Sequence, residues 1–259
     1  MAEEKIYPHI IVENNKKPNR FLAFPLIGII AKGIILIPVF IEMVFLGFVA
    51  FFALIINWFI ISITGQYWDS AYKLFLGIMR LEIKIRLYIW GITDKYPGFT
   101  FSTNNLFEFD IPKPANPNRW LATPIIGIIV RFILLIPYLI FADVLDRGSS
   151  VAMVISWFAV LFKGKFPESL YEFEKDTLRV SLASSAYMLG LSDKYPSFYI
   201  SMNHQTVKIL LILAGALLAF SNMGDFKQPA ASDQSINRYQ YNNSNYNYSP
   251  QKNINYNNY

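Results

Sequence analysis

One segment of this chain occurs twice. The stretch Asn19–Ser102 reappears as Asn118–Ser201 at a constant shift of 99 positions without a gap, and roughly 30 of the 84 aligned positions are identical. The matches include Asn-Arg at the start of each copy, Leu-Ile-Pro in its first apolar run, Trp-Phe further on and Asp-Lys-Tyr-Pro near its end. The fold must therefore be one that the same module can adopt twice.

Both copies are built around long apolar runs. Hydrophobic residues make up 54% of the 259 residues and charged residues only 16%, which is outside the usual range for a soluble domain. Between positions 21 and 63 the only formal charges are Lys32 and Glu42. Since one membrane crossing needs about 20 apolar residues, we expect an all-α integral membrane protein in which each run crosses twice.

Each copy is predicted to contain a transmembrane helical hairpin. In the first copy the two legs are Phe21–Ile41 and Met43–Ile63, with Glu42 at the tip. In the second copy the legs are Leu121–Ala142 and Ser150–Phe162, and the polar stretch between them reads as a solvated turn. The second leg of the second copy is short, so a full crossing and a partial dip both fit it.

A helix of mixed character follows each hairpin, over Trp68–Ile92 and Pro167–Leu191. We expect these helices to be amphipathic and to lie at the membrane surface. One stripe of the first helix and the matching stripe of the second carry largely opposite charges: Lys73, Gly77, Arg80 and Lys84 against Glu172, Asp176, Arg179 and Ala183. Two interpretations stay open, that the helices face each other or that both stripes are solvated.

Basic residues flank the open ends of both hairpins, which predicts a cytoplasmic N-terminus and two parallel repeats with short extended segments on the cytoplasmic side. The extended segments are expected at Pro8–Glu13 and Asn105–Ile111. Gly65 and Gly164 should end the apolar helices.

The sequence divides into six parts. They are a polar N-terminal lead (1–18), membrane repeat 1 (19–102), a linker with a short strand (103–117), membrane repeat 2 (118–201), a short hydrophobic helix (202–222) and an Asn/Tyr-rich tail predicted to be disordered (223–259). The apolar run Val207–Phe220 fits either a fifth crossing or a surface helix.

Lys32 and Arg131 occupy the same position within the first apolar run of each copy. A charge at membrane depth is costly and marks a functional candidate, pairing with Glu42 or Asp143 or contacting a lipid phosphate. The alternative is that both side chains sit at headgroup level or reach up to it.

Other candidate functional or lipid-contacting residues are also repeated. They are Arg80 and Arg179 on the mixed helices, the turns Asp94, Lys95, Tyr96 and Asp193, Lys194, Tyr195, and Trp58 and Trp157 as interfacial anchors. An acid, an amine and a phenol are able to transfer protons, but a helix-ending turn is the simpler interpretation of Asp-Lys-Tyr-Pro. The sequence contains no recognisable catalytic, cofactor-binding or metal-binding motif and no cysteine.

The Asn-Arg lead, Leu-Ile-Pro, the stretch Ser156–Pro167 and the Asp-Lys-Tyr-Pro ends resemble the prokaryotic membrane family called domain of unknown function 4389, in two tandem copies. That family often has His after Ile-Pro, whereas Val39 and Tyr138 stand there in this chain. The resemblance implies residence in a membrane, for a prokaryote the cytoplasmic (inner) membrane, and supplies no activity.

We therefore expect a non-enzymatic membrane scaffold or lipid-organising subunit. The alternatives are a pore or transporter subunit in which Lys32 and Arg131 line a path between the repeats, and a lipid-modifying enzyme that uses the Asp-Lys-Tyr-Pro turns. The expected partners are membrane lipids, in particular anionic headgroups given the net charge of +5, and a second copy or another membrane protein. Nucleic acid is not expected, because the basic residues lie beside apolar runs rather than in one cluster.

Overall fold

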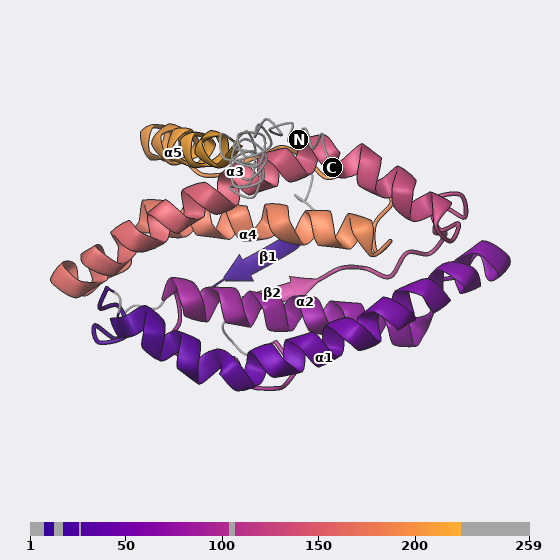
Figure 1. Ribbon diagram of the computed structural model, residues 1–259, viewed down its shortest axis with the longest axis horizontal. Coiled ribbons are helices and arrows are strands. Elements are labelled where there is room, and N and C mark those ends of the chain that lie inside the picture. Colours follow the sequence, from indigo (N-terminus) through magenta and orange to yellow (C-terminus); the bar gives the residue numbers. More distant parts are fainter. Residues whose placement is uncertain (1–7, 13–17, 26, 104–106, 224–259) are drawn as a thin grey trace, which may run out of the picture. The chain divides into compact units, whose positions relative to one another are not determined.

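The computed structural model describes residues 8–12, 18–25, 27–103 and 107–223. These residues form five helices and one two-stranded sheet (Figure 1). In chain order the elements are β1 (His9–Val12), α1 (Ile27–Thr64), α2 (Asp69–Trp90), β2 (Phe107–Asp110), α3 (Ile126–Lys163), α4 (Glu168–Met188) and α5 (Gln205–Met223). The mostly helical fold expected from the sequence is confirmed.

The chain divides into the units Met1–Ala219 and Phe220–Tyr259. Of the second unit, only the last residues of α5 are described. The Asn/Tyr-rich tail lies outside the described residues from 224 onward, as do most of the polar N-terminal lead and residues 104–106 of the linker.

Each apolar run forms one continuous helix, so the predicted hairpins are wrong. Both α1 and α3 contain 38 residues, which corresponds to about 57 Å of helix. Glu42, the expected tip of the first hairpin, lies in the interior of α1, where the sequence offers no turn-forming residue. Both helices are bent (Figure 1), and each contains one internal proline, Pro38 or Pro137, which removes a backbone hydrogen bond.

The polar residues at 143–150 contact other helices instead of forming a solvated turn. Asp146 accepts a hydrogen bond from Arg86 of α2 at 3.1 Å, and the Ser149 hydroxyl donates to Glu174 of α4. Arg147 pairs with Asp143 one turn earlier in α3, at 2.8 Å. A polar stretch within an apolar run therefore marks interhelical contacts here, and the helix passes through it without interruption.

The inner helices, α2 and α4, run back along the long helices, α1 and α3. At one end of the first pair the Asn57 side chain accepts from the backbone N–H of Trp68 at 2.9 Å, and at the other end the Lys32 amine donates to the Ile89 carbonyl at 3.2 Å. Both helices match their predicted ranges to within three residues. More than half of each helix is buried against the rest of the protein, including Glu174 and Asp176, and their place at a membrane surface stays a prediction.

The charged stripes of α2 and α4 do not face each other. In α2, Lys84 donates to the Thr100 carbonyl at 2.6 Å, and Arg80 donates to the Phe109 carbonyl at 3.2 Å. In α4, Asp176 accepts from the backbone of Met202 and Arg179 donates to the carbonyl of Tyr199. Each stripe therefore fixes extended segments, whose backbone groups need partners when they are covered.

The predicted extended segments contain the two strands. Strands β1 and β2 pair antiparallel, with His9 opposite Asp110 and Val12 opposite Phe107. Phe107 and Phe109 are buried, while the alternate residues Glu108 and Asp110 are exposed. On either side of the sheet, the Tyr72 hydroxyl of α2 donates to the carbonyl of Ile111 and the Tyr171 hydroxyl of α4 donates to that of Val12. The sheet thus ties α2 of one copy to α4 of the other.

The fifth helix contacts α3 through two glycines. A Cβ atom on Gly148 would lie 2.6 Å from the carbonyl oxygen of Leu211, and a Cβ atom on Gly215 would clash with the carbonyl oxygen of Val144. Such backbone-to-backbone approach through small residues is typical of helix packing in membranes. The helix expected at 202–222 is confirmed, and whether it crosses a membrane stays a prediction.

From the α3–α5 contact we expect alanine to destabilise the protein at Gly215 and not at Gly47. Gly215→Ala should lower the free energy of unfolding by about 1–3 kcal/mol, because the added methyl group overpacks the contact. The melting temperature of the protein in detergent should fall accordingly. Gly47→Ala in α1 is the control, because a Cβ atom there meets nothing within 4 Å. Alanine should raise or preserve the melting temperature at Gly47, since it favours helix more than glycine does. Equal effects at the two positions would contradict the described contact.

Candidate functional site: a buried cation at the end of each inner helix

Lys32 and Arg131 are both buried, each with 2% of its surface exposed. They lie near the starts of α1 and α3, and their side chains reach the C-terminal ends of α2 and α4. Neither pairs with the acid suggested by the sequence. Asp143 pairs with Arg147, and Glu42 acts on Lys84. The carbonyl groups at a helix C-terminus carry partial negative charge, which a buried cation stabilises.

Arg131 uses all three of its guanidinium nitrogens. Its Nε donates to the Leu121 carbonyl at 3.0 Å, and its Nη1 donates to the carbonyls of Tyr187 at 2.7 Å and Ser192 at 3.3 Å. Its Nη2 forms an ion pair with Asp193. The guanidinium carbon lies 5.0 Å from the centroid of the Tyr187 ring. The desolvation cost of this cation is therefore offset by directed contacts on every side.

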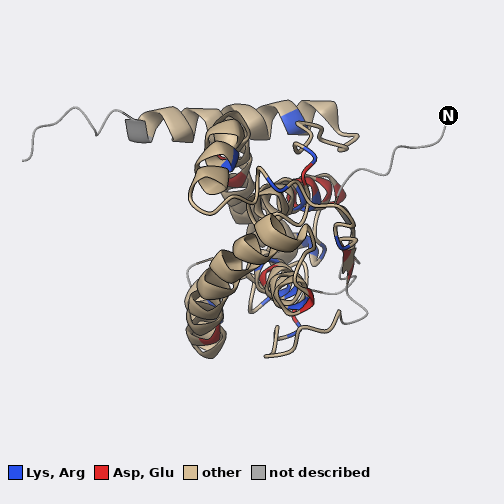
Figure 2. Cartoon of the chain, turned by 90° about the vertical axis from the view of Figure 1, so that its right-hand side faces the viewer, with Lys and Arg blue, Asp and Glu red and all other residues tan. Residues whose placement is uncertain are grey.

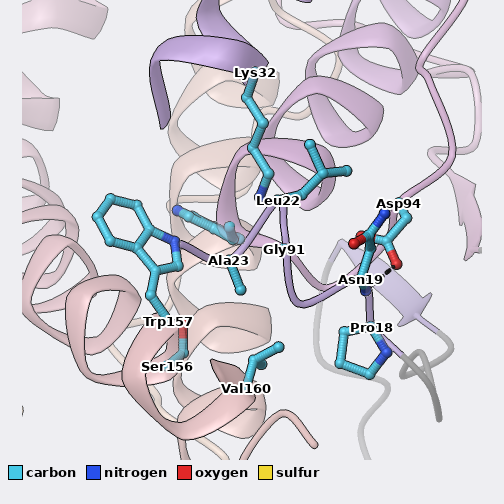
Figure 3. A pocket seen from close by; sticks show the side chains of 11 residues that line it. Pro18, Asn19, Leu22, Ala23, Lys32, Gly91, Asp94, Ser156, Trp157 and Val160 are labelled. Atoms are coloured by element: carbon cyan, nitrogen blue, oxygen red, sulfur yellow. Dashed lines mark hydrogen bonds between the residues drawn. The ribbon is translucent and has the colours of Figure 1, made fainter. Parts of the chain in front are cut away.

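Lys32 makes the corresponding contacts with a smaller group. Its amine donates to the Ile89 carbonyl and lies 5.7 Å from the centroid of the Tyr88 ring. A cavity of about 10 Å³ remains beside it, lined by residues that include Asp94, Ser156 and Trp157 (Figure 3). That volume suits one water molecule. Lysine thus leaves a gap at the place that arginine fills in the second copy.

The acids of the Asp-Lys-Tyr-Pro turns hold the Asn-Arg leads. Asp94 accepts a hydrogen bond from the backbone N–H of Asn19 at 2.8 Å, which Figure 3 shows as a dashed line. Asp193 accepts from Asn118 in the same way, at 2.7 Å. Before each turn, Gly91 and Gly190 have φ of 80° and 71°, a conformation that glycine adopts at little cost. Each turn therefore joins the end of an inner helix to the segment that precedes a long helix.

The remaining members of the turns have different surroundings. Lys95 and Lys194 are exposed. Tyr96 stacks edge-on against Phe99. Tyr195 contacts the rings of Tyr138, Tyr187 and Phe198. An exposed amine and a phenol packed among aromatic rings do not form a set aimed at one reacting atom.

Trp58 and Trp157 are buried inside the protein, with 2% and 9% of their surfaces exposed. Neither ring is free to act as the expected interfacial anchor, because each is covered by the chain itself. The indole N–H of each has no hydrogen-bond partner among the described residues. Trp157 of the second copy lines the cavity at Lys32 of the first, with its indole nitrogen turned towards that cavity (Figure 3).

The two copies exchange their leading arginines. Arg119 of the second copy donates to the Thr64 carbonyl at the end of α1, against Gly65. Arg20 of the first copy lies against Gly164 at the end of α3, where a Cβ atom would be 2.7 Å from its Nη2. Gly65 and Gly164 have φ of 73° and 65°, so the predicted glycine ends are confirmed. Each long helix is thus completed by a residue of the other copy.

A polar cluster between the copies was not predicted from the sequence. Arg86 of α2 bonds Asp146 of α3 and, at 2.9 Å, the hydroxyl of Ser181 in α4. Close by, Glu174 is fully buried, and burial raises its pKa well above the ordinary value of 4.5. Comparison of the copies gives no signal for this cluster, because Ser185, Gly47 and Phe75 stand at the positions matching Arg86, Asp146 and Glu174. For the exchanged arginines, in contrast, the repeated Asn-Arg is a signal in the sequence.

The paired cation sites are suited to holding helices together. Their polar groups are directed at backbone carbonyls and at each other, and the cavity at Lys32 is too small for a substrate. Within the described ranges no group of three or more His, Cys, Asp or Glu side chains is placed to bind a metal ion. Arg80 and Arg179, also candidates from the sequence, bind extended segments and stand apart from these sites.

Comparison with known proteins gives a match to a family model in the second copy. Residues 126–199 match the family model described as Domain of unknown function (DUF4389). This range starts with α3 and ends beyond the second Asp-Lys-Tyr-Pro turn, so it includes Arg131 and its partners Tyr187, Ser192 and Asp193, while Leu121 lies before it. No curated protein and no solved structure matches the chain.

Arg131 should contribute strongly to stability. Arg131→Leu leaves Asp193 and three carbonyl groups without their donor and should lower the free energy of unfolding by about 3–5 kcal/mol. Arg131→Lys keeps the charge and should lose less. Lys95→Leu, at an exposed position, is the control and should change the value by less than about 0.5 kcal/mol. Denaturant titration in detergent measures all three, and a small effect of Arg131→Leu would contradict the role given to this site.

The buried Glu174 should make the free energy of unfolding depend on pH. Because burial raises its pKa in the folded state, the folded protein holds a proton that the unfolded chain releases above about pH 4.5. The free energy of unfolding should therefore fall as pH rises from about 4.5 towards the pKa of the folded state. Glu174→Gln should reduce this slope and raise stability at neutral pH, whereas Glu108→Gln on the exposed face of β2 should preserve the slope. Identical slopes in wild type and Glu174→Gln would contradict the prediction.

Proposed function

We propose that this protein is a non-enzymatic membrane scaffold that embeds its long helices in lipid and organises the bilayer around them. The observation that carries the proposal is the outer face of α1, which exposes large apolar side chains from Ile27 to Ile63. Of the two formal charges of α1, Lys32 is buried and Glu42 is half-buried and acts electrostatically on Lys84 of α2. An apolar face of this length is typical of contact with acyl chains.

The second copy and α5 add to the exposed apolar surface. Both α1 and α3 are long and apolar enough to cross a membrane. α3 exposes apolar residues in two stretches, from Ile126 to Ile140 and from Val154 to Phe162, and α5 exposes several leucines up to Leu218. The glycine contact between α3 and α5 also favours a lipid environment.

Finer parts of the proposal rest on the sequence. Residues 19–102 would be a second copy of the domain matched at 126–199, and both copies would face the membrane in the same sense. The N-terminus would be cytoplasmic, and the membrane would be the cytoplasmic membrane of a prokaryote. Exposed Lys95, Lys163, Lys165 and Lys194 would contact anionic headgroups. A second copy of the chain or another membrane protein remains a candidate partner.

The alternatives receive less support. A pore between the copies would need Lys32 and Arg131 to face a path, yet both cations bind carbonyl groups and the adjoining cavity holds about one water molecule. A lipid-modifying reaction at the turns would need a free carboxylate, whereas Asp94 and Asp193 each accept a backbone hydrogen bond.

Liposome flotation tests the proposal. The protein should float with liposomes of phosphatidylcholine and phosphatidylglycerol, resist extraction at alkaline pH and change vesicle shape in electron micrographs. Phe45→Asp with Phe48→Asp places two charges on the exposed face of α1 and should reduce the bound fraction at least tenfold. Ser70→Asp with Thr103→Asp adds the same charge at exposed polar positions and should bind as wild type does. A protein that stays soluble without detergent, or vesicles unchanged at saturation, would contradict the proposal.

A further inference from the structure

The charged and extended parts of the protein lie alongside the middle of the apolar helices. α2 contains six charged residues and follows α1 from the contact at Asn57 to the contact at Lys32. Glu42, near the centre of α1, acts electrostatically on Lys84 of α2. Figure 2 shows few charged residues along α1 itself. The depth of α1 in a membrane therefore also sets the depth of α2.

A crossing orientation would place exposed extended chain in the hydrocarbon. Any stretch of about 20 residues within Ile27–Thr64 includes Phe45 and Leu46, one turn from Glu42. At this level Lys84 holds the carbonyl of Thr100, in a segment without regular structure that exposes Phe99 and Thr100. Backbone that is neither helical nor in a closed barrel is not tolerated where it faces lipid.

A crossing orientation would also place strand β2, which lies next to α2, at the level of the hydrocarbon. Arg80, one turn from Lys84, pairs with Asp110 of β2, whose side chain is 72% exposed. A carboxylate exposed at the bilayer centre costs about 2.5–3.5 kcal/mol even by the lowest scale. The second copy repeats the arrangement, since Arg179 and Asp176 of α4 hold the extended residues Tyr199 and Met202 beside α3.

From these placements we infer that α1 and α3 lie along the plane of the membrane within one leaflet and do not cross the bilayer. The apolar faces then point into the acyl chains, while α2, α4, the sheet and the extended segments remain on the aqueous side. Helix length supports this orientation, because about 57 Å of apolar helix far exceeds the ~30 Å of hydrocarbon that a crossing requires. The inference rests on the proposed membrane function and names the surface that takes part, one lipid leaflet.

Sidedness of the helix ends tests the orientation directly. The chain contains no cysteine, so single cysteines can be introduced without background. Phe21→Cys and Gln66→Cys flank α1 at exposed positions, and Trp120→Cys and Lys165→Cys are the matched pair for α3. A membrane-impermeant maleimide is added to right-side-out and inside-out vesicles from cells that express the chain. Both members of each pair should react from the same side.

A measurement of depth in the membrane separates the in-plane orientation from the proposed membrane function. A spin label on Phe45→Cys, whose parent side chain is 67% exposed, should lie about 5–10 Å below the headgroups, and a label on Thr103→Cys should lie in water. Reaction of a pair from opposite sides, or a Phe45→Cys label at the bilayer centre, overturns the in-plane orientation and leaves the membrane function standing. A Phe45→Cys label as water-accessible as that at Thr103→Cys overturns both.

Discussion

A buried cation at the end of an inner helix is the interaction on which the rest of this structure depends. In each copy the cation begins on a long apolar helix and reaches the last carbonyl groups of the helix that runs back along it. Because the acid after that helix also binds the chain before the long helix, three segments distant in sequence meet at one point. Burying the cation without these acceptors would cost several kcal/mol, so the buried position of each cation depends on these contacts.

The same arrangement explains how polar and apolar parts coexist in one chain. The inner helices have more than half of their residues buried, and their charged side chains satisfy extended backbone and one another. The helix α1 is then left with a continuous apolar surface, and α3 with apolar surfaces on either side of its polar residues at 143–150. Such segregation is what a protein needs when one of its sides meets lipid and the other meets water.

Much of this architecture could be predicted from the sequence, and the failures have physical reasons. The inner helices, the extended leads and the glycine ends follow from local patterns. The hairpins failed because length alone suggested two crossings, whereas polar residues such as Asp146 and Ser149 meet partners on other helices. Lys32 and Arg131 stand out in the sequence as special positions, but their partners at the ends of α2 and α4 are more than 50 residues away, where no periodicity indicates them.

The exchange of Arg20 and Arg119 has a consequence for how such modules exist on their own. Each long helix ends against an arginine from the opposite copy, so neither copy supplies all of its own contacts. A polypeptide with a single module would recover these contacts by associating with an identical polypeptide around a two-fold axis. Joining two modules in one gene product makes that association intramolecular and independent of concentration, and it frees each half to diverge, as the lysine in one and the arginine in the other already show.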